Sequence, residues 1–366
     1  MSSKRRSLTQ VVEDLKSEGV IADAMAERAD ALVEQLRSAQ PWYVRTMVGF
    51  GAWLASLFLI GFVAGLGIAV GGLTVVGLGL IAVAVLLRRQ SDNDFMVQGT
   101  LATSLAGQAT LAFGLAQALP GDDMKMVLAV VVVTSSVLFF IFPDRVHRVL
   151  SVLFFASALT MLVYALKLNA IVPVFGPAFA AGLVLVHRNR ARITANGQGH
   201  LVRPLESGLM LSAFGCLLLS TIYVLPEIGS DFVFYPRPWI STLLLGALFL
   251  YVGSLCLPTL LHGAGKAAAP LVYGLMIALI GCAWGAPGLL LALVVVLLGA
   301  ATGNRSFVGA GIVFLAVFVG AYFYGIEMTM LTKSVTLAGS GAVMLLARWL
   351  FLNVLTVPGD AEPQRG

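Results

Sequence analysis

The sequence predicts an all-α polytopic membrane protein, a transmembrane helix bundle of about 12 spans (10–12). Three observations favour this fold class. Of the 366 residues, 59% are hydrophobic and only 11% are charged, whereas soluble globular proteins carry about 45–50% apolar and about 25% charged residues. Apolar stretches near the bilayer-crossing length of about 20 residues recur from position 46 to position 352. Basic residues concentrate in every second connection between those stretches.

Residues 1–40 differ in kind and predict a short cytoplasmic hairpin of two amphipathic helices. Ser7 and Gln10 can form a capping box, and Gly19 can end the first helix. The apolar faces are Leu8, Val11, Val12 and Leu15 in the first helix, then Ala22, Met25, Ala29, Leu32, Val33 and Leu36 in the second. Because two short helices bury little by themselves, the segment is either a small cytoplasmic cap or a module that docks a partner.

The transmembrane domain is expected over residues 41–357, followed by a disordered cytoplasmic tail at 358–366. Its predicted spans are 46–66, 69–87, 96–118, 125–142, 148–166, 169–186, 205–225, 239–257, 268–284, 287–302, 307–326 and 329–352. The connections at 67–68 and 285–286 are very short, which leaves 10 or 11 spans open.

The distribution of lysine and arginine predicts the orientation of the chain. With both termini in the cytoplasm, ten basic residues fall in inner connections and three in outer ones. Such an excess is what the positive-inside rule requires. The inner set is Arg88, Arg89, Arg145, Arg148, Arg188, Arg190, Arg192, Arg203, Lys266 and Arg305, and the outer set is Lys125, Lys167 and Arg237.

Aromatic and polar residues beside the spans predict contacts at the membrane surface. Trp42 and Tyr43 suit an interfacial aromatic belt, and Arg45 can extend to inner-leaflet phosphates. The outer connection 226–239 is rich in aromatic residues. It either folds back onto the interface or offers an external ligand or partner the side chains of Tyr235, Arg237 and Trp239.

Ionisable residues inside spans are expensive and therefore point to function. None lies at the middle of a predicted span, and Glu206, Glu327, Lys333 and Arg348 are expected to reach the interface from within two turns of a span end. Lys333, the deepest, stands near Glu327 and forms either a boundary ion pair or a contact to a substrate or coupling ion. The lack of buried carboxylates weighs against a proton-coupled transporter.

The span at 96–118 is the most polar, with Gln98, Thr100, Thr103, Ser104, Gln108 and Thr110. Gln108 lies near the middle of the membrane. Hydrogen bonds between helices are the ordinary role of such residues, and lining a cavity is the alternative.

No catalytic, cofactor or metal site is expected, and the chain is not expected to be an enzyme. His147, His187, His200 and His262 all fall in predicted cytoplasmic connections, and no Cys, Asp or Glu stands between His187 and His200 to complete a zinc site. The three cysteines, in apolar stretches, are expected to be small buried hydrophobes. The net charge of +5 lies beside spans and does not indicate nucleic acid.

The segment PWYVRTMVGFGAWLASLFLIGFVAG, residues 41–65, resembles the opening of a bacterial family of polytopic membrane proteins that is catalogued as a domain of unknown function. The resemblance implies an inner-membrane location. Because such families are often encoded beside a second membrane-anchored protein, it also implies a hetero-complex. No catalytic residues follow from it.

These observations predict a structural or interaction subunit of an inner-membrane complex, with the lipid bilayer and a second membrane-anchored protein as partners. The alternative is a transporter or channel for a neutral or lipidic solute, which the number of spans and the polar third span favour.

Overall fold

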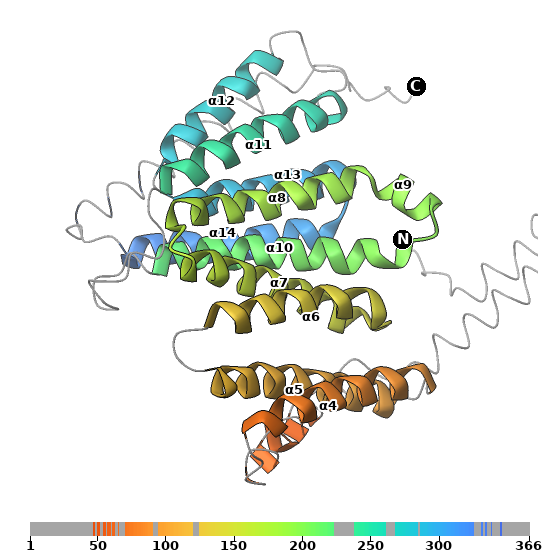
Figure 1. Cartoon of the computed structure of the whole chain (residues 1–366). Helices are drawn as coiled ribbons and strands as arrows, with labels where there is room; N and C mark the ends of the chain where they lie inside the picture. Colours follow the sequence, from red (N-terminus) through yellow and green to blue (C-terminus); the bar gives the residue numbers. More distant parts are fainter. Residues whose placement is uncertain are drawn as a thin grey trace, which may run out of the picture. The chain divides into compact units, whose positions relative to one another are not determined.

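The computed structural model describes residues 70–90, 94–119, 124–222, 238–260, 268–284 and 286–325, together with scattered helical residues between 47 and 65 and between 331 and 345. These residues are all-α and contain no strand (Figure 1). The chain divides into two units, residues 1–68 with 80–106, and residues 69–79 with 107–366.

The described helices follow one another with short connections. They are α4 (Val70–Gln90), α5 (Asp94–Ala118), α6 (Met124–Ile141), α7 (Arg145–Ala165), the 3₁₀ turn η1 (Asn169–Ile171), α8 (Val172–Arg188), α9 (Arg190–Ala195), α10 (Gly199–Ile222), α11 (Pro238–Leu260), α12 (Ala268–Cys282), α13 (Pro287–Thr302) and α14 (Arg305–Gly325). Every predicted span from 69–87 to 307–326 overlaps one of them. The predicted spans 46–66 and 329–352 are described only at scattered residues, and the predicted 1–40 hairpin and 358–366 tail lie outside the described residues.

Six stretches of described helix are long and apolar enough to cross a membrane, which makes the chain a multi-pass membrane protein. They are Gly72–Gln90, Met124–Ile141, Arg145–Ala165, Asn169–Arg188, Gly199–Leu219 and Trp239–Cys256. Val272–Gly281, Pro287–Thr302 and Arg305–Ala321 are shorter apolar helices.

Glycine lets α4 and α5 touch backbone to backbone. A Cβ on Gly77 would lie 2.5 Å from the backbone nitrogen of Leu111, and one on Gly114 would lie 2.7 Å from that of Thr74. Small residues of this kind allow close helix packing where no water drives association.

In the second unit α7, α8 and α10 form one packed layer (Figure 1). Gly208 of α10 lies against Val152 of α7, and Gly176 of α8 lies against Leu217 of α10. Polar contacts fix α11 beside this layer: the Ser241 hydroxyl donates to the carbonyl of Pro173, and the Arg188 guanidinium donates to the hydroxyl of Tyr251. The first pair lies near the start of both helices, and the second joins the end of α8 to a residue farther along α11, so the two helices run parallel.

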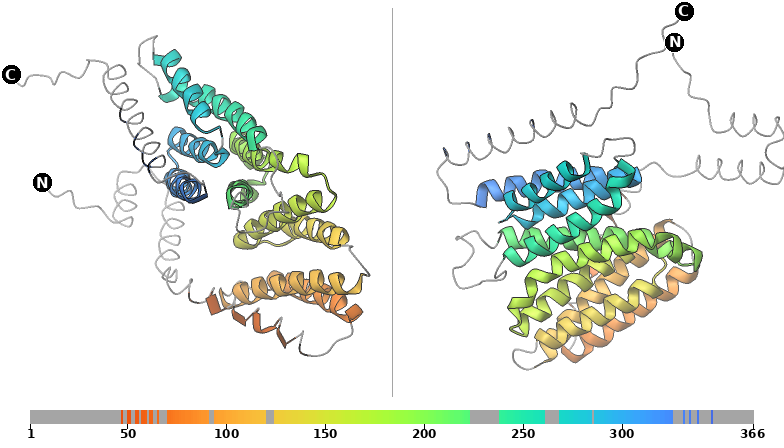
Figure 2. Two further views of the ribbon diagram at one scale, coloured as in Figure 1. Left: turned by 90° about the vertical axis from the view of Figure 1, so that its left-hand side faces the viewer. Right: turned by 90° about the horizontal axis from the view of Figure 1, so that it is seen from above.

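Helices α13 and α14 form an antiparallel hairpin (Figure 2). Pro287 opens α13, where its missing N–H costs nothing, and Gly303 closes it in the left-handed region at φ +66°. The amide of Asn304 then donates to the carbonyl of Gly299, and the Asn304 side chain accepts from the amide of Ser306 at the start of α14. The reversal therefore takes only two residues.

A Gly303→Ala substitution is expected to destabilise the protein by about 1–2 kcal/mol, because an alanine at positive φ brings its Cβ close to the carbonyl oxygen. Thermal unfolding in detergent measures the change. Gly309→Ala in α14 is the matched control, because open space surrounds Gly309 and its backbone is helical. An equal loss of stability in both variants would contradict the role of the φ angle.

Candidate functional site

The antiparallel helices α8 and α10 bury an acid and a base against each other. The sequence places His187 in the last turn of α8 and Glu206 in the second turn of α10. Nδ1 of His187 lies 2.9 Å from Oε1 of Glu206, and the two side chains are only 11% and 4% exposed. The ring of Phe307, at the start of α14, lies 5.7 Å from the imidazole centroid. The pair is therefore enclosed by three helices.

Glu206 was expected to reach the membrane interface, and the structure shows that its side chain is turned into the protein. The residue is 3% exposed, because it faces α8 and the imidazole of His187 satisfies one of its oxygens. The prediction that buried carboxylates are lacking is wrong for Glu206, because its carboxylate is buried in the protein. His187 belongs to a helix and not to a connection, and His200 is exposed. No group of three or more metal-ligating residues occurs among the described residues.

Sequence spacing carried a signal for this pair. His187 and Glu206 stand at nearly equal distances on either side of the turn at Asn196–Gly197. Two helices joined by a turn in an antiparallel hairpin bring such positions to the same level. This spacing was not used in the prediction, because the whole polar stretch 187–204, which includes α9, was expected to be a connection without helices.

Exposed arginines surround the end of the unit that holds the pair. Four come from the last turn of α8, from α9 and from the start of α10, and one begins α14; they are Arg188, Arg190, Arg192, Arg203 and Arg305. The ring contact of Phe307 with His187 puts the start of α14 at this same end. The structure thus brings together residues that the charge pattern assigned to two different inner connections.

A second buried polar group joins α6 to α7. The side chain of Asp144 accepts from the amide of His147 and caps α7, which therefore begins at Arg145 and not at the predicted 148. His147 has no exposed area and stacks on Phe142 with 4.0 Å between ring centroids. Arg148, 6% exposed, donates to the carbonyl of Phe139. The assignment of His147 and Arg148 to a connection is thus wrong, and both side chains anchor a helix junction.

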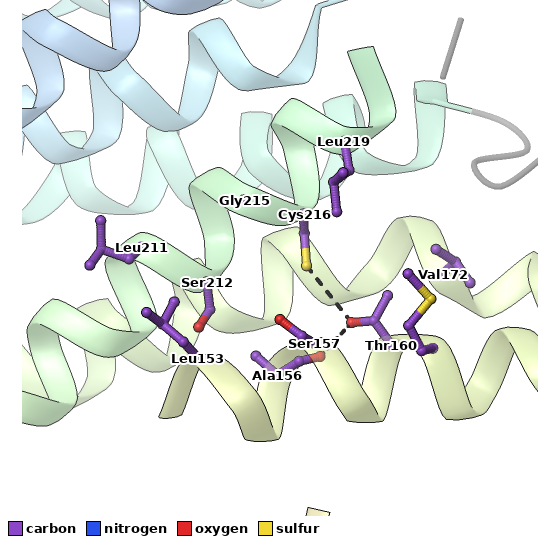
Figure 3. A pocket seen from close by; sticks show the side chains of 11 residues that line it. Leu153, Ala156, Ser157, Thr160, Val172, Leu211, Ser212, Gly215, Cys216 and Leu219 are labelled. Atoms are coloured by element: carbon purple, nitrogen blue, oxygen red, sulfur yellow. Dashed lines mark hydrogen bonds between the residues drawn. The ribbon is translucent and has the colours of Figure 1, made fainter. Parts of the chain in front are cut away.

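A small cavity of about 100 Å³ lies between α7 and α10 (Figure 3). Ser157 and Thr160 of α7 and Ser212 and Cys216 of α10 give it polar groups, and the rest of the lining is Leu153, Ala156, Met161, Val172, Leu211, Gly215 and Leu219. Thr160 donates to the carbonyl of Ala156 at 2.7 Å and lies 3.8 Å from the Cys216 sulfur. No site was predicted here, because single hydroxyls and thiols of this kind are common in apolar helices.

Of the candidate site residues predicted from the sequence, only Gln108 and Trp239 lie among the described residues. Gln108 is half-buried in α5, where Thr100, Ser104 and Thr110 are buried. Trp239 is 44% exposed at the start of α11. The described part of the chain does not bring Gln108 and Trp239 into one site. The other proposed residues lie outside the described residues; they are Trp42, Tyr43, Arg45, Tyr235, Arg237, Glu327 and Lys333.

The three cysteines were expected to be buried hydrophobes. Cys256 is buried and Cys216 is partly buried, and both are free thiols. The Cys282 side chain lies outside the described residues.

Comparison with known proteins identifies one relationship. A family model described as a domain of unknown function, DUF4401, matches residues 41–354, which is most of the chain. The match begins at Pro41, where the sequence PWYVR leads into the first predicted span, and it confirms the predicted relationship to a family of unknown function. No curated protein and no solved structure matches the chain.

Proposed function

The chain belongs to the DUF4401 family, and we propose that it is a structural or interaction subunit of a complex in the bacterial inner membrane. It would cross the membrane about 12 times, with both termini and the hairpin 1–40 in the cytoplasm. The five exposed arginines of α8, α9, α10 and α14, gathered at the end of the second unit that holds His187 and Glu206, support this orientation, because basic residues favour the cytoplasmic face.

The observation that carries the proposal is the apolar character of α13. From Pro287 to Ala301 this helix has no polar side chain, and α10, α11 and α14 pack around it. Leu290, Leu291, Val294 and Val295 have no exposed area. A water-filled pathway needs polar groups on the helices that line it. The interior of this part of the second unit is instead a dry packed core, as a scaffold requires.

The proposal includes neither enzymatic activity nor a cofactor. The hydroxyls and the thiol of the α7–α10 cavity have no His, Asp, Glu or Lys beside them in the lining. A serine or cysteine nucleophile needs such a base or a lowered pKa to react. The His187–Glu206 pair, in turn, packs against Phe307 and makes no hydrogen bond to a hydroxyl or thiol of the described residues.

Native mass spectrometry of the full chain, extracted gently from its own membranes, tests the subunit role. We expect a second polypeptide at a fixed stoichiometry with the chain. Deletion of residues 1–40 is expected to release it if the hairpin docks the partner, whereas deletion of the 358–366 tail is the control and leaves the complex intact. A solitary chain in every mild detergent would overturn the proposal.

A transporter or channel for a neutral or lipidic solute is the second candidate. The polar helix α5 favours it, since Thr110 is 4% exposed and its hydroxyl has no partner among the described residues. Liposome flux with the purified chain would separate the candidates. We would expect a transporter to lose flux in Gln108→Leu and to keep it in Gln98→Leu, a control more than two turns away on α5. That result would favour transport over the subunit role.

A further inference from the structure

The cavity between α7 and α10 lies within the membrane-crossing part of both helices. Its lining runs from Leu153 to Met161 on α7 and from Leu211 to Leu219 on α10, inside the stretches Arg145–Ala165 and Gly199–Leu219 that can cross a membrane. It opens beside Gly215, and Met161 and Leu219 at its edge are 39% and 37% exposed. A molecule that enters it therefore arrives from the hydrocarbon phase of the bilayer.

A buried hydroxyl in this cavity lacks a partner. Ser212 is 4% exposed, and its Oγ makes no hydrogen bond with the described residues. Figure 3 shows its oxygen and that of Ser157 directed into the space between the two helices. Leaving a buried hydroxyl unsatisfied costs about 1–3 kcal/mol. In a bilayer no bulk water is present to remove that cost, so a ligand that accepts or donates one hydrogen bond here gains affinity.

The lining also selects the charge and size of the ligand. It contains no Asp, Glu, Lys, Arg or His, so a charged group would be buried without a counter-ion, which is strongly unfavourable. The volume of about 100 Å³ is several times the roughly 10–15 Å³ that one water molecule needs. It accommodates a small polar head and a few carbons, and the remaining chain must leave past Gly215 into the bilayer.

We infer that this cavity binds the ester or hydroxyl head of an uncharged lipid, with Ser212 as the hydrogen-bond partner. The lipid chains would lie along the exposed side chains of Met161 and Leu219. The site goes beyond the proposed subunit role and does not depend on it, because a chain without a protein partner would still hold the lipid.

Photo-crosslinking of the full chain in lipid nanodiscs tests this site. The probe is a diacylglycerol with a diazirine in one acyl chain, and the comparison probe is a phosphatidylglycerol with the same chain. We expect the diacylglycerol to label α7 and α10 peptides at least about fivefold more than the charged probe does. An excess of unlabelled diacylglycerol should abolish this labelling.

Two substitutions in the cavity have matched controls. Gly215→Phe places a ring at the opening, where a Cβ meets no atom within 4 Å, and is expected to remove the specific labelling. Ser212→Ala should lower it about fivefold, the value of one hydrogen bond of about 1 kcal/mol. The controls are Gly309→Phe, also in open space on α14, and Ser135→Ala, a buried serine of α6 whose hydroxyl has no partner among the described residues. Both should label like the wild type.

Three results would overturn the inference. The first is equal labelling of α7 and α10 by the neutral and the charged probe. The second is labelling by the neutral probe that is spread evenly over all membrane helices. The third is specific labelling that survives Gly215→Phe. Loss of the protein partner in the mass spectrometry described above would leave this inference standing, so the two proposals fail separately.

Discussion

A Glu206→Ala variant is expected to lose about 3–5 kcal/mol of stability, the usual cost of removing one partner of a buried pair. Glu206 and His187 are almost completely buried and lie 2.9 Å apart. Truncating the carboxylate leaves the imidazole nitrogen without its partner between α8, α10 and Phe307. Unfolding of the purified protein with increasing SDS in mixed micelles measures the change.

A double-mutant cycle separates this pair from simple loss of packing. Removing both polar groups in Glu206→Leu/His187→Leu leaves no unsatisfied partner, so we expect the double variant to lose less stability than the sum of the losses in Glu206→Leu and His187→Leu. Arg203→Ala, one turn away on α10 and exposed, is the control and should change stability by less than about 0.5 kcal/mol. Strictly additive losses at His187 and Glu206 would show that the two residues do not act as a pair.

The sequence predicts the helices of this protein well because their cause is local. A run of apolar residues long enough to cross a bilayer must satisfy its own backbone hydrogen bonds, and a helix does so within the segment. The start of α13, at a proline that suits a first helical turn, follows from the same local logic. The predicted start at 169 misses that of α8, because a 3₁₀ turn, Asn169–Ile171, precedes the α-helix. The predicted start of α7 was three residues too late, because it was placed at the first residue of an apolar stretch. The helix begins earlier because Asp144 caps its N-terminus.

The polar pairs were not predictable in the same way. Glu206 was expected at the interface because the sequence shows only how far the residue lies from the end of its span. Its burial depends on the helix that its side chain faces, which is α8. His187 and Phe307 come from helices more than a hundred residues apart, and only packing shows that they meet. The α7–α10 cavity is the feature least accessible to sequence-based prediction. Ser212 and Thr160 differ from the other hydroxyl-bearing residues of the chain only in their surroundings in the folded protein.

A glycine of α13 also lets α14 approach closely beyond the turn itself. A Cβ on Gly299 would lie 2.8 Å from the backbone nitrogen of Val308 and 2.9 Å from the Cβ of Phe307. Both atoms belong to the first turn of α14, and the two-residue reversal at Gly303 holds that turn in place. The helices therefore cannot slide apart at this point without breaking the bond from Asn304 to the Gly299 carbonyl.

Gly299→Val is accordingly expected to destabilise the protein by about 3 kcal/mol, at the upper end of the range for overpacked interiors. The matched variant Gly309→Val lies in the same hairpin and meets no atom within 4 Å, so it should cost less than about 1 kcal/mol. SDS unfolding of the two variants compares them directly. Because Phe307 also covers the His187–Glu206 pair, Gly299→Val should in addition reduce the coupling measured in the double-mutant cycle. A valine at 299 that leaves both quantities unchanged would show that α13 and α14 do not approach each other as closely as this packing requires.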